Sequence, residues 1–103
     1  MKTQQPQPAI RFSLGRVLCT PGAFGAFERN ETTPIPYLSR HLSGDWGEVC
    51  EEDQLTNEEA LKTGSRLLSV YHLPDKTKIW IITEAVNEEG IREVTTLLLP
   101  EEY

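Results

Sequence analysis

The sequence predicts an α+β domain in which a short N-terminal strand and two or three short helices pack on a C-terminal antiparallel sheet of three to four strands. Three runs rich in β-branched and aromatic residues predict the sheet, at residues 66–73, 78–85 and 93–99. The turns between these runs are short, and short turns force neighbouring strands to be antiparallel. Capping residues and helical spacing in the first 64 residues predict the helices.

The N-terminal end divides into a tail and the start of the domain. Residues 1–10 are rich in Gln and Pro and offer little apolar surface to offset the entropy of ordering the backbone, so we expect a disordered tail. Residues 11–103 then form a single domain of ordinary size. Within them, Phe12, Leu14 and Leu18 alternate with other residues, which predicts a strand over residues 12–19.

Three helices are predicted from local signals. Thr20 followed by Pro21 is typical of a helix start, because Pro lacks a donor that the first helical position does not need. Apolar residues in 37–42 have helical spacing, and Gly44 follows as a natural stop. A Thr-x-x-Glu capping pattern predicts a third helix over residues 57–62.

Charge and cysteine usage limit the classes of partner. The chain carries 16 acidic and 10 basic side chains, and its net charge of −6 disfavours binding to nucleic-acid phosphates. No apolar run approaches the roughly 20 residues that cross a bilayer, and residues 1–8 do not resemble a signal peptide. We therefore expect a cytoplasmic protein without a membrane partner, in which Cys19 and Cys50 are free thiols that fill small apolar spaces.

No cofactor or metal is expected. Cys19, His41, Cys50 and His72 are suitable zinc ligands, but no two of them have the close spacing that pre-forms half of a zinc site. The glycine-rich motifs that hold phosphates are also absent.

The stretch from Arg40 to Gly47 contains a cation, an imidazole, a carboxylate and an indole around a glycine turn. One interpretation is an anion-binding or acid–base site, because an imidazole titrates near neutral pH. The other is structural: His41 covers the last helix carbonyls, Gly44 takes a left-handed conformation, and Trp46 packs on the core. The structural interpretation is favoured.

The acidic run over residues 48–53 has no glycine at the position that a calcium loop requires, so a solvated loop is expected there. It is also the most acidic part of the chain, and a basic partner protein is the natural complement of such a surface. The candidate binding residues are Asp45, Trp46, Glu48, Glu51, Glu52 and Asp53.

Residues 11–16, 20–23, 40–47, 80–84 and 95–100 together resemble a family of small uncharacterised bacterial proteins carried on plasmids and prophages, some of them described as plasmid-related proteins. The resemblance covers nearly everything after the polar tail. It implies a bacterial mobile element as the origin of the chain, and it brings no activity with it.

A second resemblance is architectural. Helices with an Arg-His pair followed by an antiparallel sheet are similar to the barnase, EndoU and RelE-like group of metal-independent ribonucleases. In such an enzyme His41 would be the general acid or base, Arg40 or Arg66 would stabilise the phosphate, and Thr96 would lie nearby.

Two functions therefore remain open. The first is a noncatalytic accessory protein that acts through protein–protein contacts, with a homodimer as an alternative if an apolar sheet face is uncovered. The second is the ribonuclease-like enzyme. They differ in a testable way, because the enzyme needs its four candidate side chains to converge in an open cleft.

Overall fold

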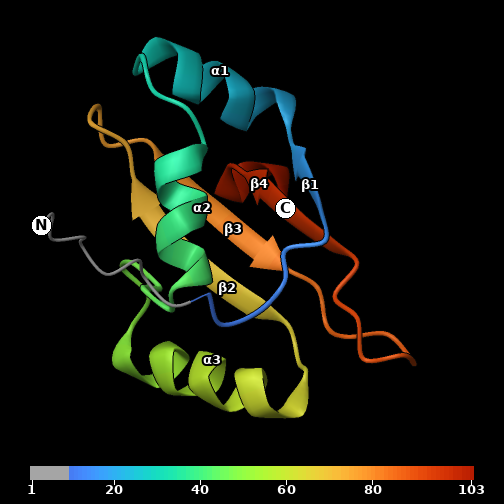
Figure 1. Ribbon diagram of the computed structural model, residues 1–103. Coiled ribbons are helices and arrows are strands. Elements are labelled where there is room, and N and C mark those ends of the chain that lie inside the picture. The colour runs from blue at the N-terminus through green and yellow to red at the C-terminus, as the bar shows by residue number, and fades with distance from the viewer. Residues whose placement is uncertain (1–9) are drawn as a thin grey trace, which may run out of the picture.

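Four strands form one mixed sheet in the computed structural model, which describes residues 10–103 (Figure 1). The strand order is β1-β4-β3-β2, with β2 antiparallel to β3 and β3 antiparallel to β4, as the short turns predict. The strands are β1 (Arg16–Cys19), β2 (Leu67–His72), β3 (Lys78–Thr83) and β4 (Val94–Leu98).

The first strand departs from the expected antiparallel sheet, because β1 runs parallel to β4. The three α-helices and the other two strands lie between β1 and β4 in the chain, and such a long connection permits a parallel pair. β1 is also shorter than the expected 12–19, since Gly15 has a positive φ of 66° just before it. A Cβ atom at Gly15 would lie 2.5 Å from the backbone of Arg92 and Glu93.

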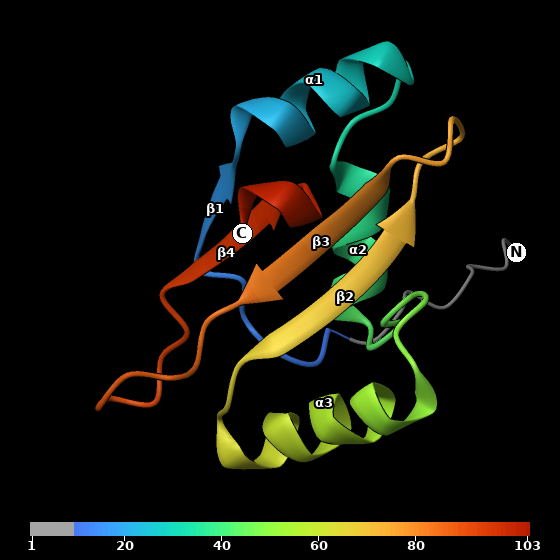
Figure 2. The same cartoon turned by 180° about the vertical axis from the view of Figure 1, so that it is seen from behind.

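Two α-helices cover one face of the sheet, and a third lies along its edge. Figure 1 shows α2 in front of the strands and α1 across the end of the sheet near β1, and Figure 2 shows that the opposite face carries no α-helix. The helices are α1 (Pro21–Arg29), α2 (Ile35–Leu42), α3 (Glu51–Thr63) and the short 3-10 helix η1 (Pro100–Glu102).

The start of α1 lies where the sequence predicts it. The Thr20 hydroxyl accepts a hydrogen bond from the Ala23 N–H at 3.2 Å, and Pro21 is the first helical residue. The carboxylate of Glu102 accepts a second bond from the Gly22 N–H at 2.9 Å. Hydrogen bonding from Thr20 is the main cause that lowers the pKa of Glu102, and the resulting negative charge suits a helix N-terminus. These bonds join η1 to the start of α1.

The start of α3 was predicted wrongly. The helix begins at Glu51 rather than at residue 57, so the run expected to be a solvated loop forms its first turn. Acidic residues in a first turn are stabilised by the positive end of the helix dipole. The Thr56 hydroxyl donates to the carbonyl of Glu52 and caps nothing, whereas Gly64 ends the helix as expected, with a φ of 86°.

The core has two parts. The larger part lies between the sheet and the helices α1 and α2, and contains Ala23, Ala26, Phe27, Leu38, Tyr71, Leu73, Ile79, Ile81 and Leu97. The smaller part lies between α3 and β2, where it contains Trp46, Val49, Ala60 and Leu67. Burial of Trp46, which is 4% exposed, confirms that this indole packs on the core.

The outer edge of β2 is closed by two segments that are not strands. The Val70 N–H donates to the carbonyl of Trp46 at 3.1 Å, and the Glu48 N–H donates to the carbonyl of Val70 at 2.7 Å. Next to them the buried Asn57 amide of α3 donates to the Leu68 carbonyl at 2.7 Å and accepts from the Leu68 N–H at 3.1 Å. The outward backbone groups of Leu68 and Val70 are therefore not available to a partner.

Three further expectations concern the ends and the surface. The predicted tail over residues 1–10 lies outside the described residues apart from Ile10. Within residues 10–103, no helix has the length and apolar character that a membrane span requires. Cys19 and Cys50 are free thiols as predicted, but both are exposed rather than filling apolar spaces.

Candidate functional site

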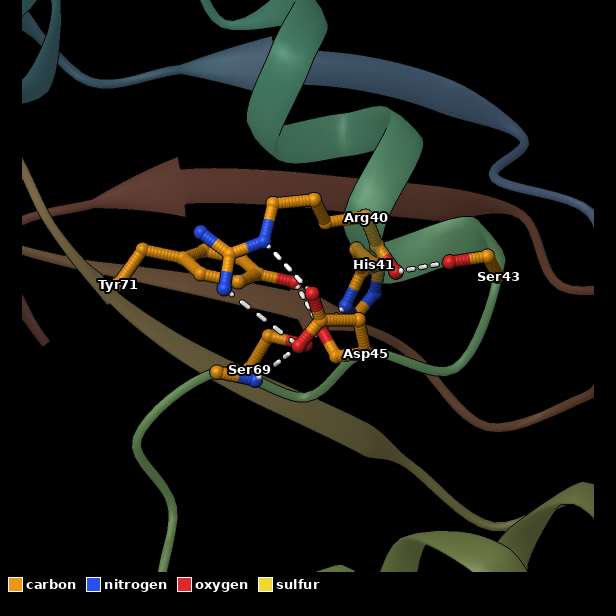
Figure 3. A network of polar contacts seen from close by, with 7 residues as sticks. Arg40, His41, Ser43, Asp45, Ser69 and Tyr71 are labelled. Atoms are coloured by element: carbon orange, nitrogen blue, oxygen red, sulfur yellow. Dashed lines mark hydrogen bonds and ion pairs between the residues drawn. The ribbon is translucent and has the colours of Figure 1, made fainter. Parts of the chain in front are cut away.

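His41 lies on α2 and is fully buried against the sheet, with 0% of its surface exposed. Its Nδ1 atom is 2.5 Å from the Ser69 hydroxyl of β2, and its Nε2 atom is 2.9 Å from the Thr83 hydroxyl of β3. Figure 3 shows the imidazole facing the sheet behind Arg40 and Asp45. The side chain does not cover the helix carbonyls, so that part of the structural interpretation is wrong.

The hydrogen bonds of His41 belong to a chain whose direction can be worked out. Thr95 donates its single hydroxyl hydrogen to the carbonyl of Leu14 at 2.8 Å, so Thr83, which lies 2.7 Å away, must donate to Thr95. Thr83 then accepts from His41 Nε2–H, which leaves Nδ1 as the acceptor for the Ser69 hydroxyl. Of the two neutral tautomers, only the Nε2–H form satisfies every one of these hydrogen bonds.

Burial holds His41 in that neutral state. Desolvation, followed by the nearby positive charge of Arg92, lowers the pKa of His41 from 6.5 to about 3. Aromatic rings enclose the imidazole, with the ring centroid of Phe12 at 5.1 Å and that of Trp46 at 5.7 Å. A group enclosed in this way cannot reach a substrate, so its role in the fold is to join α2 to β2 and β3.

The depressed pKa predicts how stability depends on pH. Below pH 6.5 His41 is protonated in the unfolded chain, whereas in the folded chain it stays neutral down to about pH 3. Protonation therefore favours the unfolded chain, and the free energy of unfolding falls as the pH falls from 6.5 to about 3. From pH 7 to pH 5 we expect a loss of about 2 kcal/mol from this group. Urea unfolding at pH 7, 6 and 5 measures it.

Two histidine variants isolate the contribution of His41 to that pH dependence. His41→Gln keeps a donor and an acceptor but cannot titrate, so its pH dependence should be weaker than that of the parent. His72→Gln replaces the partly exposed histidine that pairs with Glu48 at 2.8 Å, and should retain the fall that His41 causes. An equal fall in the parent and in His41→Gln would refute the assignment of a neutral, buried His41.

Arg40 and Asp45 form a surface cluster next to the buried hydrogen bonds of His41 (Figure 3). Arg40 Nε donates to Asp45 Oδ2 at 2.7 Å, and the Arg40 guanidinium lies over the Tyr71 ring, 4.5 Å from its centroid. The hydrogen bond from Arg40 lowers the pKa of Asp45, and Asp45 also accepts from the Gly47 N–H at 3.2 Å. The Tyr71 hydroxyl donates to the Asp45 carbonyl, and burial raises the pKa of Tyr71 to about 12. The Asp45 turn is therefore held from several sides.

The structure does not bring the four candidate catalytic side chains together. His41 and Arg40 belong to the face of the sheet that the helices cover. Thr96 lies between the buried Thr95 and Leu97 on β4, and therefore points to the opposite face. Arg66 also lies outside the helix layer, with its guanidinium 5.2 Å from the centroid of the C-terminal Tyr103 ring. No open cleft joins these groups.

The candidate binding residues are dispersed as well. Trp46 is buried and donates its indole N–H to Glu58 at 3.0 Å, and Glu48 pairs with His72. The other three acidic residues, Glu51, Glu52 and Asp53, are exposed in the first turn of α3. Within residues 10–103, no group of three His, Cys, Asp or Glu side chains is placed to hold a metal ion.

The open edge of β1 contrasts with the closed edge of β2. All four residues of β1 are exposed, including Val17 at 42% and Leu18 at 46%. The Arg16 and Thr20 N–H groups donate to the Glu93 and Leu97 carbonyls, at 2.9 and 3.0 Å, so the backbone groups that alternate with them point outward. Those groups are the N–H and C=O of Val17 and Cys19, and within residues 10–103 no strand other than β4 lies beside β1.

Sequence reasoning missed two of these features. Ser69, Thr83 and Thr95 are polar residues at the inward positions of apolar strands, and this break in alternation was the available signal for a buried polar chain. The open edge has no such signal, because the sequence of a four-residue strand does not indicate whether one or both of its edges are paired. Comparisons with protein-family models, curated proteins and solved structures gave no match.

Proposed function

We propose that this chain is a noncatalytic accessory protein that binds an extended, positively charged segment of a partner protein by adding it to the sheet at β1. The observation that carries the proposal is the difference between the two edges of the sheet. β2 is closed by Asn57 and Gly47, whereas β1 presents backbone groups that nothing in residues 10–103 pairs. Recognition by strand addition uses such groups for affinity and neighbouring side chains for specificity. The role in a bacterial mobile element rests on the resemblance of the sequence alone.

The charge of the surroundings favours a basic partner. The Glu102 carboxylate lies near the C-terminal end of β1, where it accepts from the Thr20 hydroxyl, and at the other end the backbone of Glu93 accepts from the Arg16 N–H. The whole chain has a net charge of −6, which opposes pairing of β1 with a second copy and attracts a cationic segment. Val17 and Leu18 supply apolar contacts on the two sides of the sheet.

A peptide test examines the edge directly. A blocked ten-residue peptide that alternates valine with lysine should slow amide hydrogen exchange of Val17 and Cys19 by at least about tenfold, because it pairs their outward N–H groups. Arg16 and Thr20 should change little, since β4 already pairs them. Exchange measured by NMR with and without the peptide gives the result.

The variant Val17→Pro removes one outward donor and none of the bonds that join β1 to β4. It should abolish binding of the peptide, whereas Val17→Ala keeps the N–H and should bind. A peptide with glutamate in place of lysine should bind at least about tenfold more weakly, because the Glu102 carboxylate and the negative net charge of the chain repel it. If Val17 and Cys19 are already protected in the peptide-free chain, and more so at high concentration, then a second copy occupies the edge and the proposal fails.

A further inference from the structure

A pocket of about 550 Å³ lies beside the C-terminal end of α3. The end of α3, the segment that contains Phe12, and the loop that leads into β4 form its walls. Its volume lies within the range of small-molecule sites in proteins, which is about 300–1,000 Å³. The apolar part of the lining comes from Phe12, Leu61, Val86 and Ile91.

The charged lining of this pocket is entirely positive. Lys62 and Arg92 both contribute to it, and no Asp or Glu does. This is unusual for a chain in which acidic side chains outnumber basic ones by 16 to 10. The pocket therefore differs in charge from the rest of the molecule.

Arg92 is a buried cation without a carboxylate partner. It is 6% exposed, and among residues 10–103 it takes part in no ion pair. Nη1 donates to the carbonyls of Ser65 and Glu84, at 2.7 and 2.9 Å, and Nη2 donates to the carbonyl of Ala60 at 3.1 Å. A guanidinium has five N–H groups, so these bonds leave two of them for another acceptor. Burial of a charge without a counter-charge is costly, and a bound anion would reduce that cost.

We propose that this pocket binds a small monocarboxylate with an apolar body, whose carboxylate pairs with Arg92 and Lys62 while its body packs against Phe12 and Ile91. The apolar walls of the pocket favour a ligand with an apolar body, and its two cations favour a ligand with a negative charge. The Phe12 ring already lies against the Arg92 guanidinium, 5.9 Å from centroid to carbon, so an aromatic body would extend an existing stack.

The position at a helix C-terminus limits the charge of the ligand. The Ala60 carbonyl, in the last turn of α3, accepts from Arg92, and a helix C-terminus carries about half a negative charge. Part of the positive charge in the pocket is thereby neutralised. The remainder suits a single carboxylate and not a di- or triphosphate, which proteins hold instead at helix N-termini.

Titration with benzoate and with phenylacetate tests the site in the full chain. Amide NMR signals of Gly64, Ile91 and Arg92 should shift, with a dissociation constant on the order of 1 mM or lower. Benzamide has the same shape without the charge and should bind at least about tenfold more weakly. Inorganic phosphate should not compete at equal concentration. Equal binding of benzamide, or competition by phosphate, would overturn the assignment to a monocarboxylate.

Two variants that leave the fold intact locate the ligand. Lys62→Gln and Ile91→Ala both change exposed side chains of the pocket and should each weaken benzoate binding by about fivefold or more. Arg66→Gln is the matched control, because it removes an exposed cation outside the pocket and should leave binding unchanged. Unaltered affinity in Lys62→Gln would refute the site. Binding of the lysine peptide at β1 is measured on different amides, so either proposal can fail without the other.

Discussion

Replacement of His41 by alanine is expected to lower the free energy of unfolding by about 4 kcal/mol. The change leaves the buried Ser69 hydroxyl without an acceptor for its hydrogen, at a cost of about 1–3 kcal/mol, and removes the donor to Thr83, which keeps its bond to Thr95. The missing ring also leaves a cavity beside Phe12 and Trp46, which adds to the loss. Urea unfolding monitored by tryptophan fluorescence measures the effect.

The neighbouring Arg40→Ala is the control for this result. Arg40 and Asp45 pair at the surface, where ion pairs contribute about 0–1 kcal/mol, so its loss should be small by comparison. A loss in His41→Ala no larger than that in Arg40→Ala would mean that the buried hydrogen-bond chain does not hold α2 on the sheet.

Gly47→Ala is expected to cost about 3 kcal/mol or more, for a different reason. A Cβ atom at Gly47 would lie 2.0 Å from the carbonyl oxygen of Val70 and 2.7 Å from the Tyr71 ring. The Val70 carbonyl is fixed by its bond from the Glu48 N–H, so it cannot move without opening the edge of β2. Gly47 also has a φ of 76°, which disfavours any residue with a side chain.

Gly90→Ala separates the two causes of that cost. Gly90 has a similar φ of 78°, but nothing lies within 4 Å of the Cβ position. It should therefore cost only the conformational penalty of about 1–2 kcal/mol. Thermal or urea unfolding of the two variants gives the difference, and equal losses would show that the contact with Val70 contributes nothing.

Much of the fold could be predicted because its signals are local. The alternating and β-branched runs determine β2, β3 and β4, and the pair Thr20-Pro21 determines where α1 begins. The direction of β1 could not be predicted, because it depends on which distant strand accepts it. The start of α3 was missed because Cys50 makes no side-chain capping bond, and the acidic first turn is stabilised by the helix dipole instead.

The candidate site was less accessible to sequence reasoning. The turn around Asp45 and the packing of Trp46 follow from local residue types, and the structure agrees with both. The partners of His41 come from two different strands that are distant in sequence, so no residue spacing predicts them. Arg92 is a further example. Its sequence position indicates an exposed loop, but its guanidinium is buried and donates to the carbonyls of Ala60, Ser65 and Glu84.

The parallel pairing of β1 with β4 has a consequence for synthesis on the ribosome. β1 is translated before β2 and β3, yet its neighbour in the sheet, β4, follows both of them, and Glu102, which joins α1, comes after β4. The nascent chain therefore cannot pair β1 with the sheet until β4 has been made, and a product truncated before β4 would leave the edge of β3 exposed to other chains.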